Sequence, residues 1–207
     1  RDENHTLLAV DYSQIELRIV ASVAEDAGMM EAFHAGIDIH TATAAKVFGV
    51  DIADVTKEQR YKAKSVNFGL IYGQGAFGLS QNLGIKRGEA AELIEAYFAQ
   101  FGGVKKYMDD SVKFCRENGF VKTIMGRKRF IPDINSSNQT VVGFAERNAI
   151  NAPIQGSAAD MIKLAMINIH ARLEKMKVGT KMLLQVHDEL LFDVPKTELE
   201  EMTAVIK

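Results

Sequence analysis

The sequence predicts an α+β fold, in which a small antiparallel sheet backed by helices carries a mostly helical insertion. An apolar run at residues 6–10 is typical of a buried strand, and this strand ends at Asp11. Near the other end of the chain, residues 181–186 and 189–194 are typical of a hairpin with a tight turn. Because the intervening sequence favours helices, we expect strands from the two ends of the chain to pair in one sheet.

The elements between these strands are predicted in chain order. A hairpin is expected in FVKTIMGRKRFIP, with Gly126 at its turn. Pro153 is expected to separate two further helices, because proline removes a helix hydrogen bond. Another helix is expected to begin near Lys196. The predicted helical segments are about 14–24, 39–48, 56–72, 86–100, 103–117, 138–150 and 155–176.

Composition and charge are those of an ordinary globular protein. The 207 residues are 47% hydrophobic and 25% charged, with a net charge of −2, which argues weakly against a nucleic-acid binder. Any phosphate contacts must therefore come from local clusters. The single cysteine, Cys115, excludes an internal disulfide and favours a reducing cytoplasm. No apolar run reaches the ~18 residues that span a bilayer, so no membrane partner is expected. The chain begins without methionine, and we expect it to be a piece of a longer protein.

Two aspartates lie at the predicted sheet. Asp11 ends the first strand, and Asp188 lies at the tip of the last hairpin with Glu189 beside it. Phosphoryl transfer by two Mg²⁺ ions about 3.5–4 Å apart needs rigid oxygen ligands, which aspartates at strand ends can provide. Alternatively, Asp11 caps the helix that follows and Asp188 only forms a turn.

A second candidate site lies on the helix predicted at 56–72. Arg60, Lys64, Phe68 and Tyr72 recur every four residues and form one slowly winding stripe. The two cations are about 6 Å apart along the axis, which suits neighbouring phosphates, and the two rings offer flat faces to a base and sugar. An ordinary amphipathic helix is the alternative. Residues that weaken the second half of this helix indicate a surface that approaches a ligand: Asn67, Gly69 and Gly73.

Three further sets of polar residues are weaker candidates. Arg147, Asn151 and Gln155 are also four residues apart and suit acceptor atoms in a minor groove, although a solvated helix face would look the same. His40 is either a capping or partly buried histidine or a phosphate contact. The first hairpin carries a basic cluster that suits either a phosphate backbone or a solvated turn: Lys122, Arg127, Lys128 and Arg129.

Three segments in order, DYSQIELR, RYKAKSVNFGLIYG and QVHDEL, resemble the signature motifs of family A DNA polymerases of the bacterial polymerase I type. The connecting segments DIHTATAAKVFG, GRKRFIPDINSSN and ERNAINAPIQGSAADMIK are also similar to that family, so the resemblance covers essentially the whole chain. It implies a first part of the palm at 1–30, fingers at 31–130 and a second part of the palm at 131–207. The thumb and nuclease domains are expected to be absent from this chain.

The resemblance also implies a role for each matching residue. Metal binding falls to Asp11, Asp188 and the backbone carbonyl of Tyr12. Nucleotide binding falls to Gln14, Glu16, His40, Arg60, Lys64, Phe68 and Tyr72, with Glu16 as the steric gate against a ribose 2′-hydroxyl. Arg60 and Lys64 hold the triphosphate, and Lys64 stabilises or protonates the leaving pyrophosphate. Contacts to primer–template DNA fall to Arg147, Asn151, Gln155 and His187, and Glu189 is an auxiliary acid.

The implied activity is that of a DNA-directed DNA polymerase acting in DNA replication or repair. It transfers deoxynucleotides from their triphosphates to a primer 3′-hydroxyl, as the template directs, and releases pyrophosphate. Two Mg²⁺ ions are expected as cofactors, with Mn²⁺ as a substitute. The expected protein is a monomer in the cytoplasm, associated with the nucleoid, and this fragment is expected to need the thumb for activity.

Single residues or motifs distinguish three rival interpretations of this sequence. A phage-type single-subunit RNA polymerase must admit the 2′-hydroxyl, which the bulky acid Glu16 would obstruct. A polymerase-like module without activity would be expected to lack one of the aspartates or Lys64, and all are present. A plain helical domain would not carry the three motifs in order. One departure from the family, FGGV where many relatives carry a proline, touches a helix junction only.

Overall fold

The computed structural model describes residues 3–207, which form two compact units. The first unit combines the residues up to Ile15 with Ala158–Lys207, and the second is Glu16–Ser157. Small antiparallel sheets and many helices confirm the predicted α+β class. The palm and fingers boundaries at residues 30 and 130 stay a prediction.

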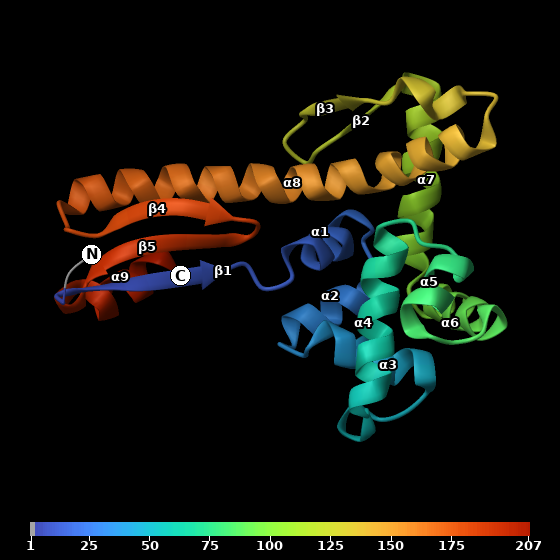
Figure 1. Cartoon of the computed structure of the whole chain (residues 1–207), viewed down its shortest axis with the longest axis horizontal. Helices are drawn as coiled ribbons and strands as arrows, with labels where there is room; N and C mark the ends of the chain where they lie inside the picture. The colour runs from blue at the N-terminus through green and yellow to red at the C-terminus, as the bar shows by residue number, and fades with distance from the viewer. Residues whose placement is uncertain (1–2) are drawn as a thin grey trace. The chain divides into compact units, whose positions relative to one another are not determined.

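A three-stranded antiparallel sheet is the centre of the first unit (Figure 1). Its strands are β1 (His5–Asp11), β4 (Lys181–Val186) and β5 (Glu189–Pro195), in the order β1-β5-β4. The central strand β5 buries Leu190, Phe192 and Val194. A 3-10 turn, Lys196–Glu198, leads into α9 (Leu199–Ile206), which packs against β1 and β5. Strands from the two ends of the chain thus share one sheet.

The second unit is mostly helical. A short hairpin of β2 (Phe120–Lys122) and β3 (Lys128–Phe130) has Gly126, with φ +82°, in its turn. The 3-10 turns are η1 (Ile52–Asp54) and η2 (Pro132–Asn135). Helices α2 and α5 lie in segments for which the sequence analysis predicted no separate element. The helices are α1 (Ile15–Val23), α2 (Ala27–His34), α3 (Ile39–Phe48), α4 (Lys57–Ile71), α5 (Ala76–Leu83), α6 (Arg87–Gln100) and α7 (Gly102–Asn118).

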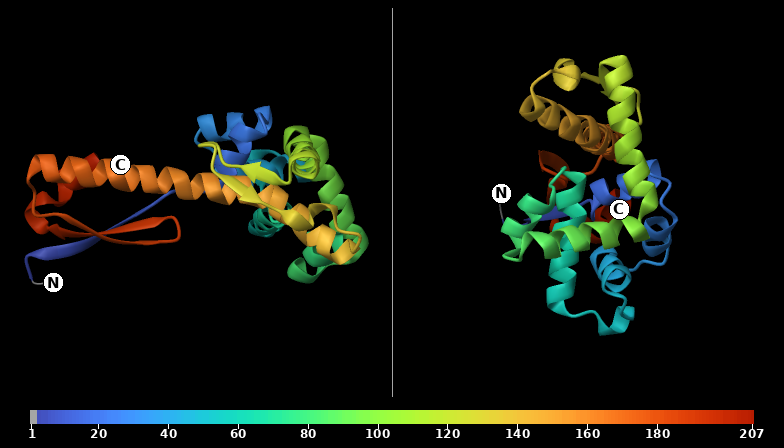
Figure 2. Two further views of the ribbon diagram at one scale, coloured as in Figure 1. Left: turned by 90° about the horizontal axis from the view of Figure 1, so that it is seen from above. Right: turned by 90° about the vertical axis from the view of Figure 1, so that its right-hand side faces the viewer.

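The predicted helix break at Pro153 is wrong, because α8 (Gln139–Met176) runs through it as one continuous ribbon (Figure 2). An interior proline costs a helix about 3 kcal/mol. Burial on both sides offsets this cost, since Ala149 and Ile154 are 0% and 1% exposed. The Ser157 hydroxyl donates to the Pro153 carbonyl at 2.5 Å and accepts from the backbone N–H of Ile124 at 3.0 Å, which fastens the turn after the proline to the β2–β3 hairpin.

The α3–α4 pair positions most of the candidate residues of the second unit. The two helices pack against each other, and the side chains that they bury include small ones, among them Ala42 and Ala45 on α3 and Ala63 on α4. Small residues allow the two helix axes to approach closely, so polar side chains on one helix can reach those on the other.

No helix within residues 3–207 has both the length and the apolar composition that crossing a membrane requires.

The start of α4 is fixed by a local capping box, which gives a first prediction. The Thr56 hydroxyl accepts from the Gln59 N–H at 3.2 Å, and the Gln59 side chain accepts from the Thr56 N–H at 2.9 Å. We expect Thr56→Ala to lower the free energy of unfolding by about 1 kcal/mol, measured by urea denaturation, because one helix N–H loses its acceptor. Thr56→Ser retains the hydroxyl and is the control; equal losses in both variants would contradict the capping role.

Candidate functional site

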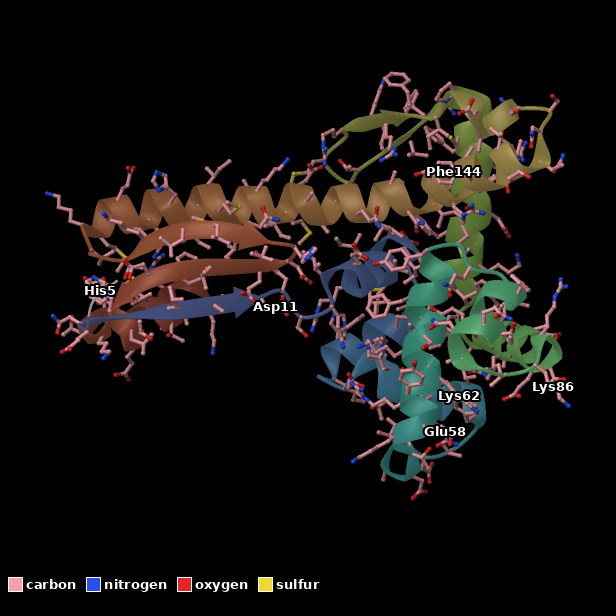
Figure 3. The ribbon with its side chains drawn as sticks, in the orientation of Figure 1. His5, Asp11, Glu58, Lys62, Lys86 and Phe144 are labelled. Carbon is pink, nitrogen blue, oxygen red and sulfur yellow. The ribbon has the colours of Figure 1, made fainter. Side chains whose placement is uncertain are left out.

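The pairing of β1 with β5 brings acidic residues from opposite ends of the chain side by side. Asp11 is the register partner of Glu189, and the backbone N–H of Tyr12 donates to the carbonyl oxygen of Asp188 at 3.1 Å. Figure 3 shows Asp11 at the end of β1, beside the turn that joins β4 to β5. One end of the sheet therefore carries both candidate metal-binding aspartates and the auxiliary acid.

These residues form a partial ligand set for a hard cation. Among residues 3–207, no group of three or more His, Cys, Asp or Glu side chains is arranged to hold a metal ion. Mg²⁺, however, is usually held by one or two carboxylates together with water and substrate phosphates rather than by a cage of protein ligands. The carboxylates of Asp11 and Asp188 and the carbonyl of Tyr12 are all oxygen donors, so they fit such a shared site.

Two residues next to the acids have a left-handed backbone. Gln14 has φ 56° and His187 has φ 54°, backbone angles that residues other than glycine rarely adopt. Each costs about 1–3 kcal/mol and persists only where the surrounding structure enforces it. Such residues cluster at binding and catalytic sites, and both were candidate residues from the sequence.

The stripe on α4 lies on the accessible side of the helix. Arg60, Lys64 and Tyr72 are exposed and Phe68 is partly exposed, whereas the opposite side is buried. The ring of Phe68 stacks on that of Tyr72, with centroids 6.2 Å apart and planes 15° apart. The stripe is thus not the buried side of an ordinary amphipathic helix, and its cations and rings are available to a ligand.

Arg60 is held by an acid that the sequence analysis did not identify. Its Nε and Nη2 donate to the two carboxylate oxygens of Asp38 at 2.9 and 3.1 Å, a two-point ion pair. Asp38 also caps α3 by accepting from the backbone N–H and the hydroxyl of Thr41. Partial burial opposes its ionisation, but the hydrogen bonds from Arg60 and Thr41 outweigh this and hold the pKa of Asp38 well below its usual range.

His40 lies in the first turn of α3, next to the stripe. It is 3% exposed, its ring centroid is 5.5 Å from that of Phe68, and its Nδ1 is 3.1 Å from Nδ2 of Asn67 on α4. Burial lowers the pKa of His40. The residue is therefore buried and adjacent to the stripe, and its contact with a phosphate stays a prediction.

The end of α4 is tied to α1. The hydroxyl of Tyr72 donates to a carboxylate oxygen of Glu16 at 2.5 Å. Glu16 lies in the first turn of α1 and Tyr72 is the C-terminal cap of α4, so this bond joins the candidate steric gate to the aromatic end of the stripe.

The third candidate set shares one helix, because α8 is continuous. Arg147 lies against Gly73, where an added Cβ would be 2.4 Å from the Arg147 Cγ, and Gly73 has φ +74°. Within residues 3–207, Oδ1 of Asn151 is buried without a hydrogen-bond partner. Gln155 lines a small pocket together with the basic cluster of the β2–β3 hairpin. The guanidinium of Arg127 donates there to the Gly156 carbonyl at 3.0 Å.

The candidate residues fall into two groups, one in each unit. The first unit holds Asp11, Tyr12, Gln14, His187, Asp188 and Glu189. The second holds Glu16, His40, Arg60, Lys64, Phe68, Tyr72, Arg147, Asn151 and Gln155. Asp38 has no role among the sequence predictions, and Asn67 is noted there only as a weak helix former. An Asp three residues before Thr41 is a capping signal that could have identified Asp38.

Comparison with known proteins shows a match along the whole chain. The family model of DNA polymerase family A matches residues 1–207. DNA polymerase I of Caldicellulosiruptor bescii is 52% identical over 203 residues, covering 98% of this chain and 24% of that protein. DNA polymerase I of Streptococcus pneumoniae TIGR4 is 53% identical over 206 residues, with 99% and 24% covered. The chain thus spans about a quarter of the length of these relatives.

A solved structure shares the same fold. The POL domain of Pol1 from M. smegmatis, in complex with DNA primer-template and dNTP, superposes with a TM-score of 0.95 at 46% identity. The match covers 99% of this chain and 36% of that one.

The ion pair of Asp38 generates a prediction about stability and pH. Asp38→Asn keeps a capping side chain but removes the charge opposite Arg60, so we expect about 0.5–1 kcal/mol less unfolding free energy at neutral pH, the range for a solvent-screened pair. Because the pKa of Asp38 is lowered by folding, its contribution is present above the unfolded value of 3.8 and is lost as the pH falls below it. Urea denaturation at a series of decreasing pH values should therefore give free energies of unfolding that converge for the two proteins.

The matched control is Asp54→Asn, which neutralises an exposed acid on η1. It should leave the free energy of unfolding unchanged. The ion-pair explanation would be contradicted if the free energies of unfolding of Asp38→Asn and the unmodified chain still differed by the same amount below pH ~3.

Proposed function

This chain belongs to DNA polymerase family A, and we propose that it forms the nucleotide-adding core of a DNA-directed DNA polymerase. The proposed reaction transfers a deoxynucleotide to a primer 3′-hydroxyl, directed by a template, and releases pyrophosphate. The observation that carries the proposal is the meeting of acids from both ends of the chain at the edge of one sheet. The accessible cationic and aromatic stripe on α4 is the second support.

The stripe on α4 suits the incoming nucleotide. Arg60 and Lys64 would bind the triphosphate, since guanidinium and ammonium groups pair with phosphate oxygens. Phe68 would pack against the sugar and base, and His40 would contact a phosphate. Arg60 is paired with Asp38 at 2.9 Å, so triphosphate binding must compete with that carboxylate or share the guanidinium with it.

Asp11, Asp188 and the carbonyl of Tyr12 would hold two Mg²⁺ ions, for which Mn²⁺ could substitute. When bound, such ions activate the attacking hydroxyl and neutralise charge on the phosphates. The carboxylates would orient the primer end, and Glu189 would contribute negative charge beside them. This part of the proposal rests on the oxygen donor set and on the close approach of Tyr12 to Asp188.

In the chemical step the primer 3′-hydroxyl releases its proton to water as its oxygen bonds to the α-phosphorus. The bond from the α-phosphorus to the bridging oxygen of the pyrophosphate breaks. Negative charge grows on the departing pyrophosphate, where Arg60 and Lys64 would stabilise it, and Lys64 can also supply its proton. Because cleavage of the triphosphate supplies the free energy of the reaction, the protein residues need only position the two reactants and stabilise the negative charge on the phosphates.

Glu16 would exclude ribonucleotides by occupying the space of a 2′-hydroxyl. The hydrogen bond from Tyr72 at 2.5 Å supports this role, because it fixes the carboxylate in one position. A fixed acid at that point would obstruct the substrates of an RNA polymerase, which favours DNA synthesis over the phage-type RNA polymerase alternative.

The DNA would be bound by residues from both groups. Arg147, Asn151 and Gln155 offer donors from one helix to the minor groove, and His187 would lie near the primer end. The basic β2–β3 hairpin would contact backbone phosphates. The chain spans 24% of the length of a relative, and we propose that further domains of the complete protein grip the duplex. Activity should therefore be measured in the complete protein. A monomer associated with the nucleoid is the proposed working state.

The metal assignment is tested by removing either aspartate. In the complete polymerase, we expect Asp11→Ala or Asp188→Ala to abolish primer extension, with a loss of at least about 1000-fold, while primer–template binding measured by fluorescence anisotropy is retained. Glu200→Ala, which removes an exposed acid from α9, is the matched control and should extend primers normally. Near-normal extension by either aspartate variant would refute the assignment.

The gate assignment is tested by sugar selectivity. We expect Glu16→Ala to raise the efficiency of ribonucleotide relative to deoxynucleotide incorporation by roughly tenfold or more. Tyr72→Phe keeps the ring and the carboxylate but removes their hydrogen bond, so it should relax selectivity less than Glu16→Ala. Selectivity unchanged in Glu16→Ala would exclude Glu16 as the gate.

A further inference from the structure

A buried polar network joins α3 to α4 beside the stripe. Asn67 is 0% exposed, and its amide nitrogen donates to Nδ1 of His40 at 3.1 Å and to the Thr43 hydroxyl at 3.0 Å. Thr43, also 0% exposed, donates back to Oδ1 of Asn67 at 3.3 Å. Because a buried polar group without a partner is costly, the three side chains fix one another's orientation.

The network determines which nitrogen of His40 carries the proton. An amide NH₂ group can only donate, so Nδ1 of His40 must be the acceptor. In a neutral imidazole the proton is then on Nε2. Within residues 3–207 the bond to Asn67 is the one hydrogen bond of this ring, so the Nε2–H donor is left for a ligand.

The charges around His40 also favour the neutral ring. Burial lowers the pKa of His40, the carboxylate of Asp38 on α3 raises it, and the cations Arg60 and Lys64 on α4 lower it again. The net effect is a lowered pKa, which keeps the imidazole uncharged at neutral pH. Protonation of His40, which would add a third cation beside Arg60 and Lys64, is therefore expected only in acid.

We propose that Asn67 is a positioning residue that holds His40 as a neutral donor, with its Nε2–H directed to a phosphate oxygen of the incoming nucleotide. The identity of the acceptor rests on the proposed function. Arg60 and Lys64 supply the charge that attracts the triphosphate, whereas His40 supplies one directional hydrogen bond. Protonating His40 would place a proton on Nδ1, where the Asn67 amide already donates, so this hydrogen bond favours the neutral ring over the pH range in which histidine normally titrates.

The simpler explanation is that Asn67 only joins two helices. That explanation predicts a change in stability when Asn67 is replaced, but no change in the tautomer of His40 or in the pH dependence of nucleotide binding. Asn67→Asp separates the two, because a carboxylate of the same shape can only accept. It would move the His40 proton to Nδ1 and raise the pKa of the ring.

The first experiment observes the ring directly. The 207-residue chain is labelled with ¹⁵N-histidine, and long-range ¹H–¹⁵N spectra are recorded without ligand. The His40 signals are assigned by their loss in His40→Gln. We expect a neutral ring with the proton on Nε2 between pH ~6 and ~8. A ring protonated on Nδ1, or on both nitrogens, at neutral pH would overturn the proposal without any variant of Asn67.

The second experiment measures the pH profile of KM for dATP in the complete polymerase. In Asn67→Asp, we expect KM relative to the unmodified enzyme to be raised at least about tenfold at high pH, the effect of losing one hydrogen bond to a charged group. The ratio should fall towards one in acid, where both ring nitrogens are protonated, and kcat at saturating dATP should change less. Dividing by the unmodified enzyme removes the titration of the nucleotide itself.

The matched control is Asn82→Asp, which makes the same chemical change at an exposed position of α5. It should keep the KM ratio near one at every pH. A pH-independent KM ratio in folded Asn67→Asp, with circular dichroism and melting temperature as checks on folding, would overturn the role of Asn67. Absence of any nucleotide addition by the unmodified enzyme would instead overturn the proposed function, and the spectra of the unliganded chain would still decide the tautomer.

Discussion

The antiparallel pairing of β1 with β5 is the constraint on which the candidate site depends. The two strands pair from His5 opposite Pro195 to Asp11 opposite Glu189, so the last pair of the ladder carries two acids. A slip of one residue would turn every side chain of β1 to the other face of the sheet. Along β1 the partly buried Thr6, Leu8 and Val10 alternate with exposed residues, and this alternation opposes such a slip. The hydrophobic core of the first unit therefore also fixes the positions of its acids.

The second unit carries its candidate cations on α4, next to charged and polar groups of α3. In the proposed function, a chain with a net charge of −2 binds a highly charged anion, which requires cations that are concentrated and accessible. Arg60 is oriented by Asp38, and burial lowers the pKa of the neighbouring His40. The packing of α3 against α4 thereby places a paired cation beside a buried imidazole.

Local signals in the sequence predicted the elements that local interactions determine. The capping box at Thr56 located α4 to within about a residue, and the apolar run before Asp11 located β1. Pro153 was misjudged because its cost is local, whereas the burial that offsets it comes from tertiary packing. The Asp38–Arg60 ion pair could not be predicted for the same reason, because its residues belong to two helices that meet only through tertiary packing. Asn67 was noted as a poor helix former, and its partners on α3 explain its presence.

The union of the two chain ends in one sheet has a consequence for biosynthesis. During translation β1 leaves the ribosome before its partner β5, and all the helices α1 to α8 are made between the two strands. Until β5 emerges, β1 has no strand to pair with, and contacts so distant in sequence form slowly after the local helices. A nascent chain can fold α3 and α4 early and still hold its acids apart. The acidic edge therefore cannot assemble until β5 has been made, after the helices that separate it from β1.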